Sequence, residues 1–184
     1  MIMRDLEESA FKDYCTNICR VKSIEKHFEE KDFRVYYNDG SVIPFNSRMR
    51  KWIEFSNFHC CKLEYEGMLF NSSEQMFFYL LTVQQPHLQK LVMQQSDARS
   101  VKLLHIPDEQ QGLNRNTVMR LCLQTKFEQC SKFRNALLST KDMTLIEYAP
   151  WGDYYWGCNL KDNYYFGCNA MGRLLMELRN KYKG

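Results

Sequence analysis

One carboxylate in the sequence stands where it can take part in chemistry rather than in closing a helix. In the segment 72–81, SSEQMFFYLL, Ser72 and Gln75 have the spacing of a capping box, which closes a helix start without the neighbouring Glu74. The positive end of that helix favours the ionised form of Glu74 by about 0.3 to 1 kcal/mol. The carboxylate could stabilise a developing cation or orient water; the alternative is that it only complements the helix dipole. Helical spacing sets it beside three apolar side chains, Phe77, Phe78 and Leu81.

A second candidate site is the aromatic segment 150–157, PWGDYYWG. Flat side chains beside a carboxylate suit a nucleoside: Tyr155 and Trp156 would flank the heterocycle, while Asp153 accepts a hydrogen bond from a sugar hydroxyl or from water. The equally supported alternative is a packed turn, in which the aromatic side chains are core and Asp153 bonds the backbone.

A third candidate is the segment 167–173, GCNAMGR, which leads into a predicted amphipathic helix. Asn169 is a suitable N-cap, and backbone N–H groups at a helix start can hold a phosphate, to which Arg173 would add positive charge. The alternative is capping alone, since nearly every helix has such a start.

Several chemistries lack their motifs. No G-x-S-x-G, G-x-G-x-x-G or P-loop pattern occurs, which argues against acyl transfer, kinases and dinucleotide-fold dehydrogenases. We therefore predict no cofactor, and we predict no metal site because two Cys/His groups lack paired zinc-ligand spacing: Cys15-x3-Cys19 with His27, and His59-Cys60-Cys61.

Charge gives little indication of a partner. The formal net charge of +3 leaves nucleic acid neither implied nor excluded. Four basic residues are spread over predicted helices with Phe127 and Phe133 between them, a pattern that predicts a solvated face over a core: Arg120, Lys126, Lys132 and Arg134.

Length and composition predict one folded domain. The chain has 184 residues, 45% of them hydrophobic and 14% aromatic. No apolar stretch approaches the roughly 20 residues that a membrane-spanning helix needs, and residues 1–14 lack the pattern of a signal peptide. We therefore predict a cytoplasmic chain with no membrane partner, whose eight cysteines are thiols.

The elements that must position these residues are mostly helices with a small sheet, so we predict an α+β fold. Strand signals predict a hairpin over 33–45 around Asn38-Asp39-Gly40 and a second hairpin joining 61–65 to 68–70. The related sequences YYWGCN at 154–159 and YYFGCN at 164–169 predict two related turns. Helices are predicted within 1–30, from Ser72 to near Pro86, and at 87–95, 97–104, 116–129, 131–139 and 170–181, with a short strand at 144–148.

Five ordered blocks carry a resemblance to a known family: FSNF at 55–58, SSEQMFF at 72–78, VMRLCLQTKFEQCSKFRNALLST at 118–140, LIEYAPWGDYYWG at 145–157 and GCNAMGRLLMELR at 167–179. In order and spacing they resemble the NADAR family, also called YbiA-like. The resemblance implies a predominantly helical α+β domain over 45–184, with 1–44 as an N-terminal extension of helix and hairpin, packed on the domain or part of it. It also implies hydrolysis of an N-glycosidic bond.

The resemblance implies roles for individual residues. Glu74 occupies the position of the catalytic glutamate, and Asp153 would orient the sugar or share the proton transfer. Lys102 follows Val101 where the family commonly has a G-R pair. The predicted substrate-binding residues are Asn57, Lys102, Tyr155, Trp156, Asn169, Gly172 and Arg173.

Two activities are associated with the family, and the substrate differs between them. Some members resemble hydrolases of early ribosylamino-pyrimidine phosphates of riboflavin synthesis, and others remove ADP-ribose from guanine in nucleic acid. Ser47 stands where the second group tends to carry a lysine, which favours the first activity, without a Schiff base. A tryptophan often found in the family is replaced by Gln110 or Gln111. The alternatives are the ADP-ribosyl glycohydrolase and a non-catalytic module that binds ADP-ribose or nucleotides; the sequence predicts no oligomeric state.

Overall fold

The computed structural model describes residues 33–106 and 114–183, so the helices predicted within 1–30 and the positions of Gln110 and Gln111 lie outside the described residues. The chain divides into two compact units. The first, here called the sheet unit, holds residues 33–45 and 142–176 of the described chain. The second, the helical unit, holds residues 46–141 and 177–183.

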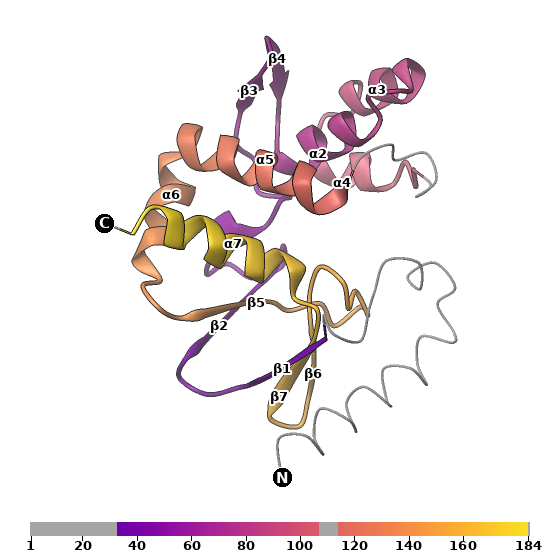
Figure 1. Cartoon of the computed structure of the whole chain (residues 1–184). Coiled ribbons are helices and arrows are strands. Elements are labelled where there is room, and N and C mark those ends of the chain that lie inside the picture. Colours follow the sequence, from indigo (N-terminus) through magenta and orange to yellow (C-terminus); the bar gives the residue numbers. More distant parts are fainter. Residues whose placement is uncertain (1–32, 107–113, 184) are drawn as a thin grey trace. The chain divides into compact units, whose positions relative to one another are not determined.

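The sheet unit is built on two small sheets. In the first, β1 (Arg34–Tyr37) and β6 (Asn159–Lys161) flank β7 (Tyr164–Gly167), with both pairings antiparallel, as Figure 1 shows. In the second, β2 (Val42–Phe45) pairs in parallel with β5 (Thr144–Glu147). Apolar side chains from both strands of this pair are buried, among them Phe45 and Ile146.

The predicted hairpin over 33–45 is wrong in its pairing. Both strands form, but β1 pairs with β7 and β2 pairs with β5. The turn between them is stabilised as its residues suggest, because the Asp39 carboxylate accepts hydrogen bonds from the backbone N–H and the hydroxyl of Ser41. Local turn chemistry therefore sets the reversal of the chain, while burial against segments far along the sequence selects the strand partners.

The two related sequences near residue 160 do not form two related turns. The first copy does contain a turn, at residues 154–156, whereas the second copy contains strand β7. Strand pairing separates them, because β7 is the central strand of its sheet, whereas residues 154–156 belong to no strand.

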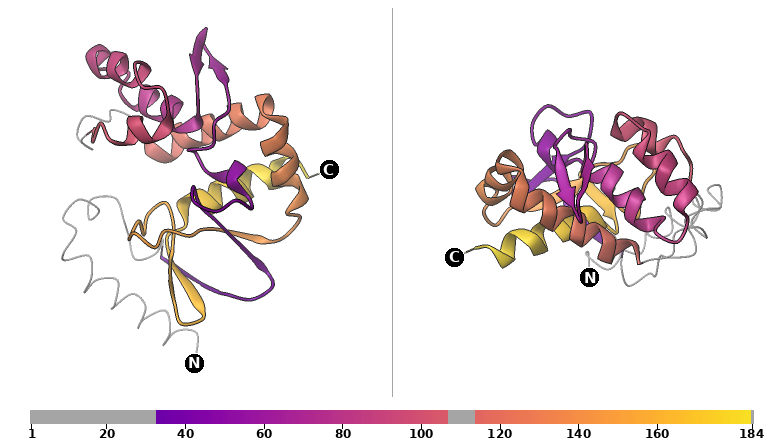
Figure 2. Two further views of the ribbon diagram at one scale, coloured as in Figure 1. Left: turned by 180° about the vertical axis from the view of Figure 1, so that it is seen from behind. Right: turned by 90° about the horizontal axis from the view of Figure 1, so that it is seen from above.

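The helical unit contains the second predicted hairpin and most of the helices. The hairpin is confirmed: β3 (Leu63–Tyr65) pairs antiparallel with β4 (Met68–Phe70), and Figures 1 and 2 show it projecting from the helices of this unit. Together with the sheet unit, these elements confirm the predicted α+β fold. The helices are η2 (Ile53–Phe55), α2 (Ser73–Leu81), α3 (Pro86–Met93), α4 (Ala98–Lys102), α5 (Arg115–Gln129), α6 (Ser131–Ser139) and the end of α7 (Ala170–Lys181).

Helix α2 is the centre of the helical unit and packs against α3, α4 and α5. Gln75 links α2 to the end of α3, because its amide nitrogen donates hydrogen bonds to the carbonyls of Val92 (3.1 Å) and Gln95 (3.0 Å). Its amide oxygen accepts from Asn71 N (2.8 Å), just before the helix. The first turn of α2 is thereby fixed from both sides. The buried apolar side chains of α2 are Met76, Phe77, Phe78 and Leu81.

Two general expectations concern the described residues only. No helix among them is long and apolar enough to cross a membrane. The cysteines in the described ranges are free thiols, namely Cys60, Cys61, Cys122, Cys130, Cys158 and Cys168.

Candidate functional site

Glu74 lies in the first turn of α2 and is almost fully buried, with 8% of its side chain exposed. The helix start is closed without it, as predicted: the Ser72 hydroxyl accepts a hydrogen bond from Gln75 N at 3.2 Å. The backbone N–H of Glu74 donates to the carbonyl oxygen of Asn57 at 3.2 Å, which ties the helix start to the preceding segment. The carboxylate therefore sits at the positive end of a helix in a poorly hydrated place, where electrostatic interactions are stronger than in water.

Lys102, at the end of α4, forms an ion pair with this carboxylate. Its Nζ lies 3.9 Å from Glu74 Oε1 and 5.6 Å from the centre of the Phe78 ring, and its side chain is 52% exposed. Only the lysine of this pair is exposed, and the distance is close to the limit of about 4 Å for an ion pair, so solvent weakens the attraction on the side of Lys102. Lys102 is thus placed to exchange its partner for an anionic group of a ligand at little cost.

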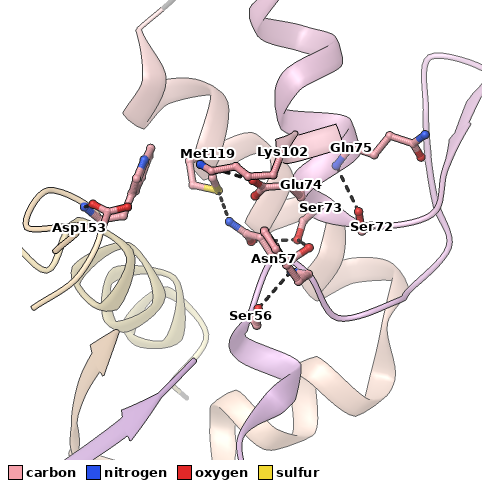
Figure 3. A network of polar contacts seen from close by, with 11 residues as sticks. Ser56, Asn57, Ser72, Ser73, Glu74, Gln75, Lys102, Met119 and Asp153 are labelled. Carbon is pink, nitrogen blue, oxygen red and sulfur yellow. Dashed lines mark hydrogen bonds and ion pairs between the residues drawn. The ribbon is translucent and has the colours of Figure 1, made fainter. Parts of the chain in front are cut away.

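Asn57 is held in the same network, which Figure 3 shows. The Ser73 hydroxyl donates to Asn57 Oδ1 at 2.9 Å, and Asn57 Nδ2 donates to the sulfur of Met119 at 3.2 Å. Asn57, Glu74 and Lys102, three residues predicted separately from the sequence, therefore lie in one network within the helical unit.

Lys126 is the residue of this network that the sequence analysis missed, because its segment was interpreted as a solvated face. Its side chain is completely buried, and its Nζ donates to the Ser56 carbonyl at 2.8 Å and, more weakly, to the Ser73 hydroxyl at 3.5 Å. It also lies 4.9 Å from the centre of the Phe133 ring. The spacing did contain a signal: Lys126 follows the buried Met119 by seven residues and the buried Cys122 by four, which puts it on the buried stripe of α5.

Burial lowers the pKa of Lys126 to about 8, because the charged form is poorly hydrated there. Attraction to the ionised forms of four surrounding groups opposes this shift without cancelling it: Cys61, Cys130, Glu54 and Glu74. The lysine is consequently charged at neutral pH and loses its proton in mildly alkaline solution.

In the sheet unit, Asp153 closes a local turn. Its Oδ1 accepts a hydrogen bond from Trp156 N at 2.9 Å, as in the packed-turn alternative. Trp156 is buried, and Tyr155 meets it edge to face at 5.0 Å between ring centroids. Asp153 and Tyr155 are half-buried, so each keeps some surface that a ligand can reach, and their contact with substrate stays a prediction.

Asn169 is fully buried and binds the backbone of β5. Its Oδ1 accepts from Glu147 N at 3.0 Å and its Nδ2 donates to the Leu145 carbonyl at 2.8 Å. The first two backbone N–H groups of α7, those of Ala170 and Met171, donate to carbonyls of residues 155 and 156 at 3.0 Å each. These bonds disfavour a phosphate at this helix start; the direct contact predicted for Asn169 stays a prediction.

The two other predicted residues near this helix start differ in exposure. Gly172 is buried, and a Cβ atom there would overlap the Leu145 carbonyl oxygen and lie 2.5 Å from Asn169 Oδ1, so only glycine allows α7 to lie this close to β5. Arg173 is exposed, and its charge acts on the half-buried Tyr36. Burial raises the pKa of the Tyr36 phenol, opposed by its hydrogen bond with Asn169 and by Arg173.

Comparison with known proteins places these residues in a family. The family model described as the NADAR domain matches residues 44–183. The chain belongs to the NADAR family. A relative named N-glycosidase YbiA from Escherichia coli (strain K12) is 29% identical over 147 residues, covering 77% of this chain and 88% of that protein. The N-glycosidase YbiA of Shigella boydii is 28% identical with the same coverage.

The solution structure of the E. coli protein YbiA has a similar fold. It matches with a TM-score of 0.63 and 24% sequence identity, over 86% of this chain and 89% of that chain. This NADAR match includes both the segment that carries Glu74 and the segment that carries Asp153.

The described part of the NADAR domain has no group of three or more His, Cys, Asp or Glu side chains that could hold a metal ion. The residues best suited to catalysis lie around Glu74, where its buried carboxylate, the fixed amide of Asn57 and the half-exposed ammonium of Lys102 belong to one network. Such a group can stabilise positive charge that develops on a bound molecule and can accept a proton from water.

Proposed function

We propose that the chain is an N-glycosidase that hydrolyses the C–N bond between a ribosyl carbon and a heterocycle or its amino group, with a ribosylamino-pyrimidine phosphate as the substrate. The observation that carries this proposal is the buried Glu74 carboxylate, which the helix cap leaves unused, beside Asn57 and Lys102. Membership of the NADAR family and the name N-glycosidase of the E. coli and Shigella relatives support the reaction class.

In the proposed reaction the C–N bond breaks as the anomeric carbon takes on oxocarbenium character. The negative charge of Glu74 stabilises that cation, and the same carboxylate accepts a proton from the attacking water. The new C–O bond forms at the anomeric carbon, and the proton taken from the water passes to the departing nitrogen. Glu74 thereby returns to its ionised form, and the products are a free sugar phosphate and a free amine. Lys102 would hold the phosphate as a point charge.

The predicted substrate contacts in the sheet unit remain part of the proposal. Asp153 is assigned to a sugar hydroxyl or to the proton transfer, and Tyr155 and Trp156 to the heterocycle. Arg173 is the exposed cation of this group and is assigned to an anionic group of the ligand. Asn169 and Gly172 are assigned mainly to holding the start of α7 close to β5, which positions Arg173.

The test is direct. The protein is incubated separately with a ribosylamino-pyrimidine 5′-phosphate and with oligonucleotides that carry ADP-ribosylated guanine, and mass spectrometry is used to look for the freed base or sugar. The Glu74→Gln variant, purified in the same way, controls for contaminating hydrolases. Release from the first substrate supports the proposal. Release from the second alone would replace the substrate class, and tight binding without release from either would identify a non-catalytic module.

A further inference from the structure

Lys126 is a buried cation that the proposed reaction does not use. We propose that it is a positioning residue, which fixes the direction of the hydrogen-bond chain from Lys126 through Ser73 to Asn57 and so presents an amide N–H of Asn57 to an oxygen atom of the substrate. The identity of that substrate rests on the proposed function. The direction of the hydrogen bonds rests only on the contacts among Lys126, Ser73 and Asn57.

The direction follows from what each group can do. A charged lysine has three N–H donors and no acceptor, so Ser73 Oγ can only accept from Lys126 Nζ, at 3.5 Å. The single hydroxyl proton of Ser73 is then directed away from the lysine, and its shortest acceptor is Asn57 Oδ1 at 2.9 Å. An amide whose oxygen is fixed in this way cannot turn over, and its nitrogen must face the opposite side.

On that opposite side Asn57 Nδ2 reaches the sulfur of Met119, as Figure 3 shows. A thioether sulfur is a weak acceptor, whereas a sugar hydroxyl or phosphate oxygen is a strong one. The bond to Met119 therefore holds the amide in place and can be exchanged for a stronger bond when a ligand arrives. The backbone carbonyl oxygen of Asn57 accepts a hydrogen bond from the backbone N–H of Glu74. This bond fixes the two residues that carry the amide and the proposed catalytic carboxylate relative to each other.

The strong anchor of Lys126 is the Ser56 carbonyl, at 2.8 Å. This bond holds the ammonium beside the segment Ser56-Asn57, and the centre of the Phe133 ring lies 4.9 Å from Lys126 Nζ. The ionisable groups that act on the ammonium come from several elements: Glu54 in η2, Glu74 in α2, Cys61 before β3 and Cys130 between α5 and α6. Burial, and after it the charge of Lys126, lower the pKa of His59.

Deprotonation would remove the constraint on direction. A neutral amine can accept a hydrogen bond, so Ser73 could donate to Lys126 instead of to Asn57, and the amide could turn over. Because the pKa of Lys126 is about 8, the orientation of Asn57 should weaken as the pH rises through that value.

The experiment compares wild-type protein with Lys126→Met, which keeps a similar shape without donors, and with Lys132→Met as the matched control. Lys132 is exposed on α6, so the control removes one nearby lysine outside the chain of hydrogen bonds. Two quantities are measured between pH 6.5 and 9.5: the NMR signals of the Asn57 side-chain amide in ¹⁵N-labelled protein, and kcat/KM for base release from a ribosylamino-pyrimidine 5′-phosphate.

We expect the Asn57 amide signals to titrate near pH 8 in wild type and in the control, and to be independent of pH in Lys126→Met. We expect kcat/KM to fall about 10- to 100-fold in Lys126→Met, the loss typical of a misplaced contact, and its alkaline decline to disappear. Ser73→Ala should resemble Lys126→Met, and the double variant should be no worse than either, because both break one chain.

Identical Asn57 signals and an identical pH profile in wild type and Lys126→Met would overturn the proposal, as would fully additive losses in the double variant. Should Lys126→Met fail to fold, Ser73→Ala carries the same comparison. If wild type releases no base, the proposed function fails, while the NMR titration still decides whether Lys126 orients Asn57.

Discussion

Glu74 is the residue on which the proposed chemistry depends most directly. We expect Glu74→Gln to lower kcat by about 10²- to 10⁴-fold, because the amide can neither accept a proton nor offset a developing cation. The substitution nearly preserves shape, and neither the cap of α2 nor the Ser73–Asn57 bond uses the carboxylate. Steady-state kinetics with a thermal unfolding curve checks this, and full turnover by a normally folded variant would exclude Glu74 as the catalytic base.

Lys102 should affect binding more than the chemical step. It is half-exposed and lies 3.9 Å from Glu74, so its removal leaves the buried contacts intact. We expect Lys102→Ala to raise KM for a phosphorylated riboside about 10-fold with a smaller change in kcat, and Lys102→Arg to restore or lower KM, since its fork binds phosphate through two bonds. The comparison is made at low and high salt. Equal effects on phosphorylated and unphosphorylated substrates would contradict the phosphate contact.

At the residue scale, the sequence predicted what a short motif carries. A cap pattern and the family blocks mark Glu74 and Asn57, and Lys102 is marked by its position where the family commonly has a G-R pair. The spacing of basic and aromatic residues predicts a solvated Lys126, because lysine side chains are usually hydrated, whereas the buried stripe of α5 includes it. The role of a buried charge depends on neighbours from η2 and α2, which the local pattern of α5 does not contain.

At the scale of elements, the close packing of α7 on β5 depends on one glycine. We expect Gly172→Ala to lower the free energy of unfolding by about 2 to 4 kcal/mol, because its Cβ would overlap the Leu145 carbonyl oxygen in a rigid backbone. The matched control is Gly40→Ala, where no atom lies within 4 Å of the added Cβ and the change should stay within about 0.5 kcal/mol. Urea unfolding followed by circular dichroism measures both. Equal stability of the two variants would show that the helix can move away from the strand.

Helices and the 61–70 hairpin were predictable because their signals are local: caps, apolar spacing and a Glu66-Gly67 turn. The partners of β1 and β2 were not, because each lies about 100 residues or more along the chain. Tyr37 pairs with Tyr164, and Val42 with Thr144. The turn at Asp39 is compatible with a hairpin and with the observed pairing alike, and only the burial of faces decides between them.

At the scale of the whole molecule, a buried ammonium makes stability depend on pH. The pKa of Lys126 is about 8 in the folded chain against 10.5 for an ordinary lysine, so between these values the unfolded chain binds more protons than the folded one. The contribution of Lys126 to the free energy of unfolding therefore rises between about pH 8 and pH 10.5, and it is lowest at neutral pH. Buried thiols and phenols with raised pKa values, such as Cys122 and Tyr165, act in the opposite direction as they ionise.

Comparison with Lys126→Met separates the lysine from those other groups, which are present in both proteins and largely cancel. We expect the free energy of unfolding of wild type, minus that of Lys126→Met, to increase by on the order of 3 kcal/mol between pH 7 and pH 10.5. Urea titrations at intervals of half a pH unit measure it, and a flat difference would mean that the ammonium is hydrated in solution. The pH range in which the charge costs most stability is the range in which it can hold Ser73 and Asn57 in one direction. A protein with an apolar side chain of similar shape in place of the lysine would be no less stable at neutral pH. We therefore expect the buried charge to be kept because it positions residues of the site, and not because it stabilises the core.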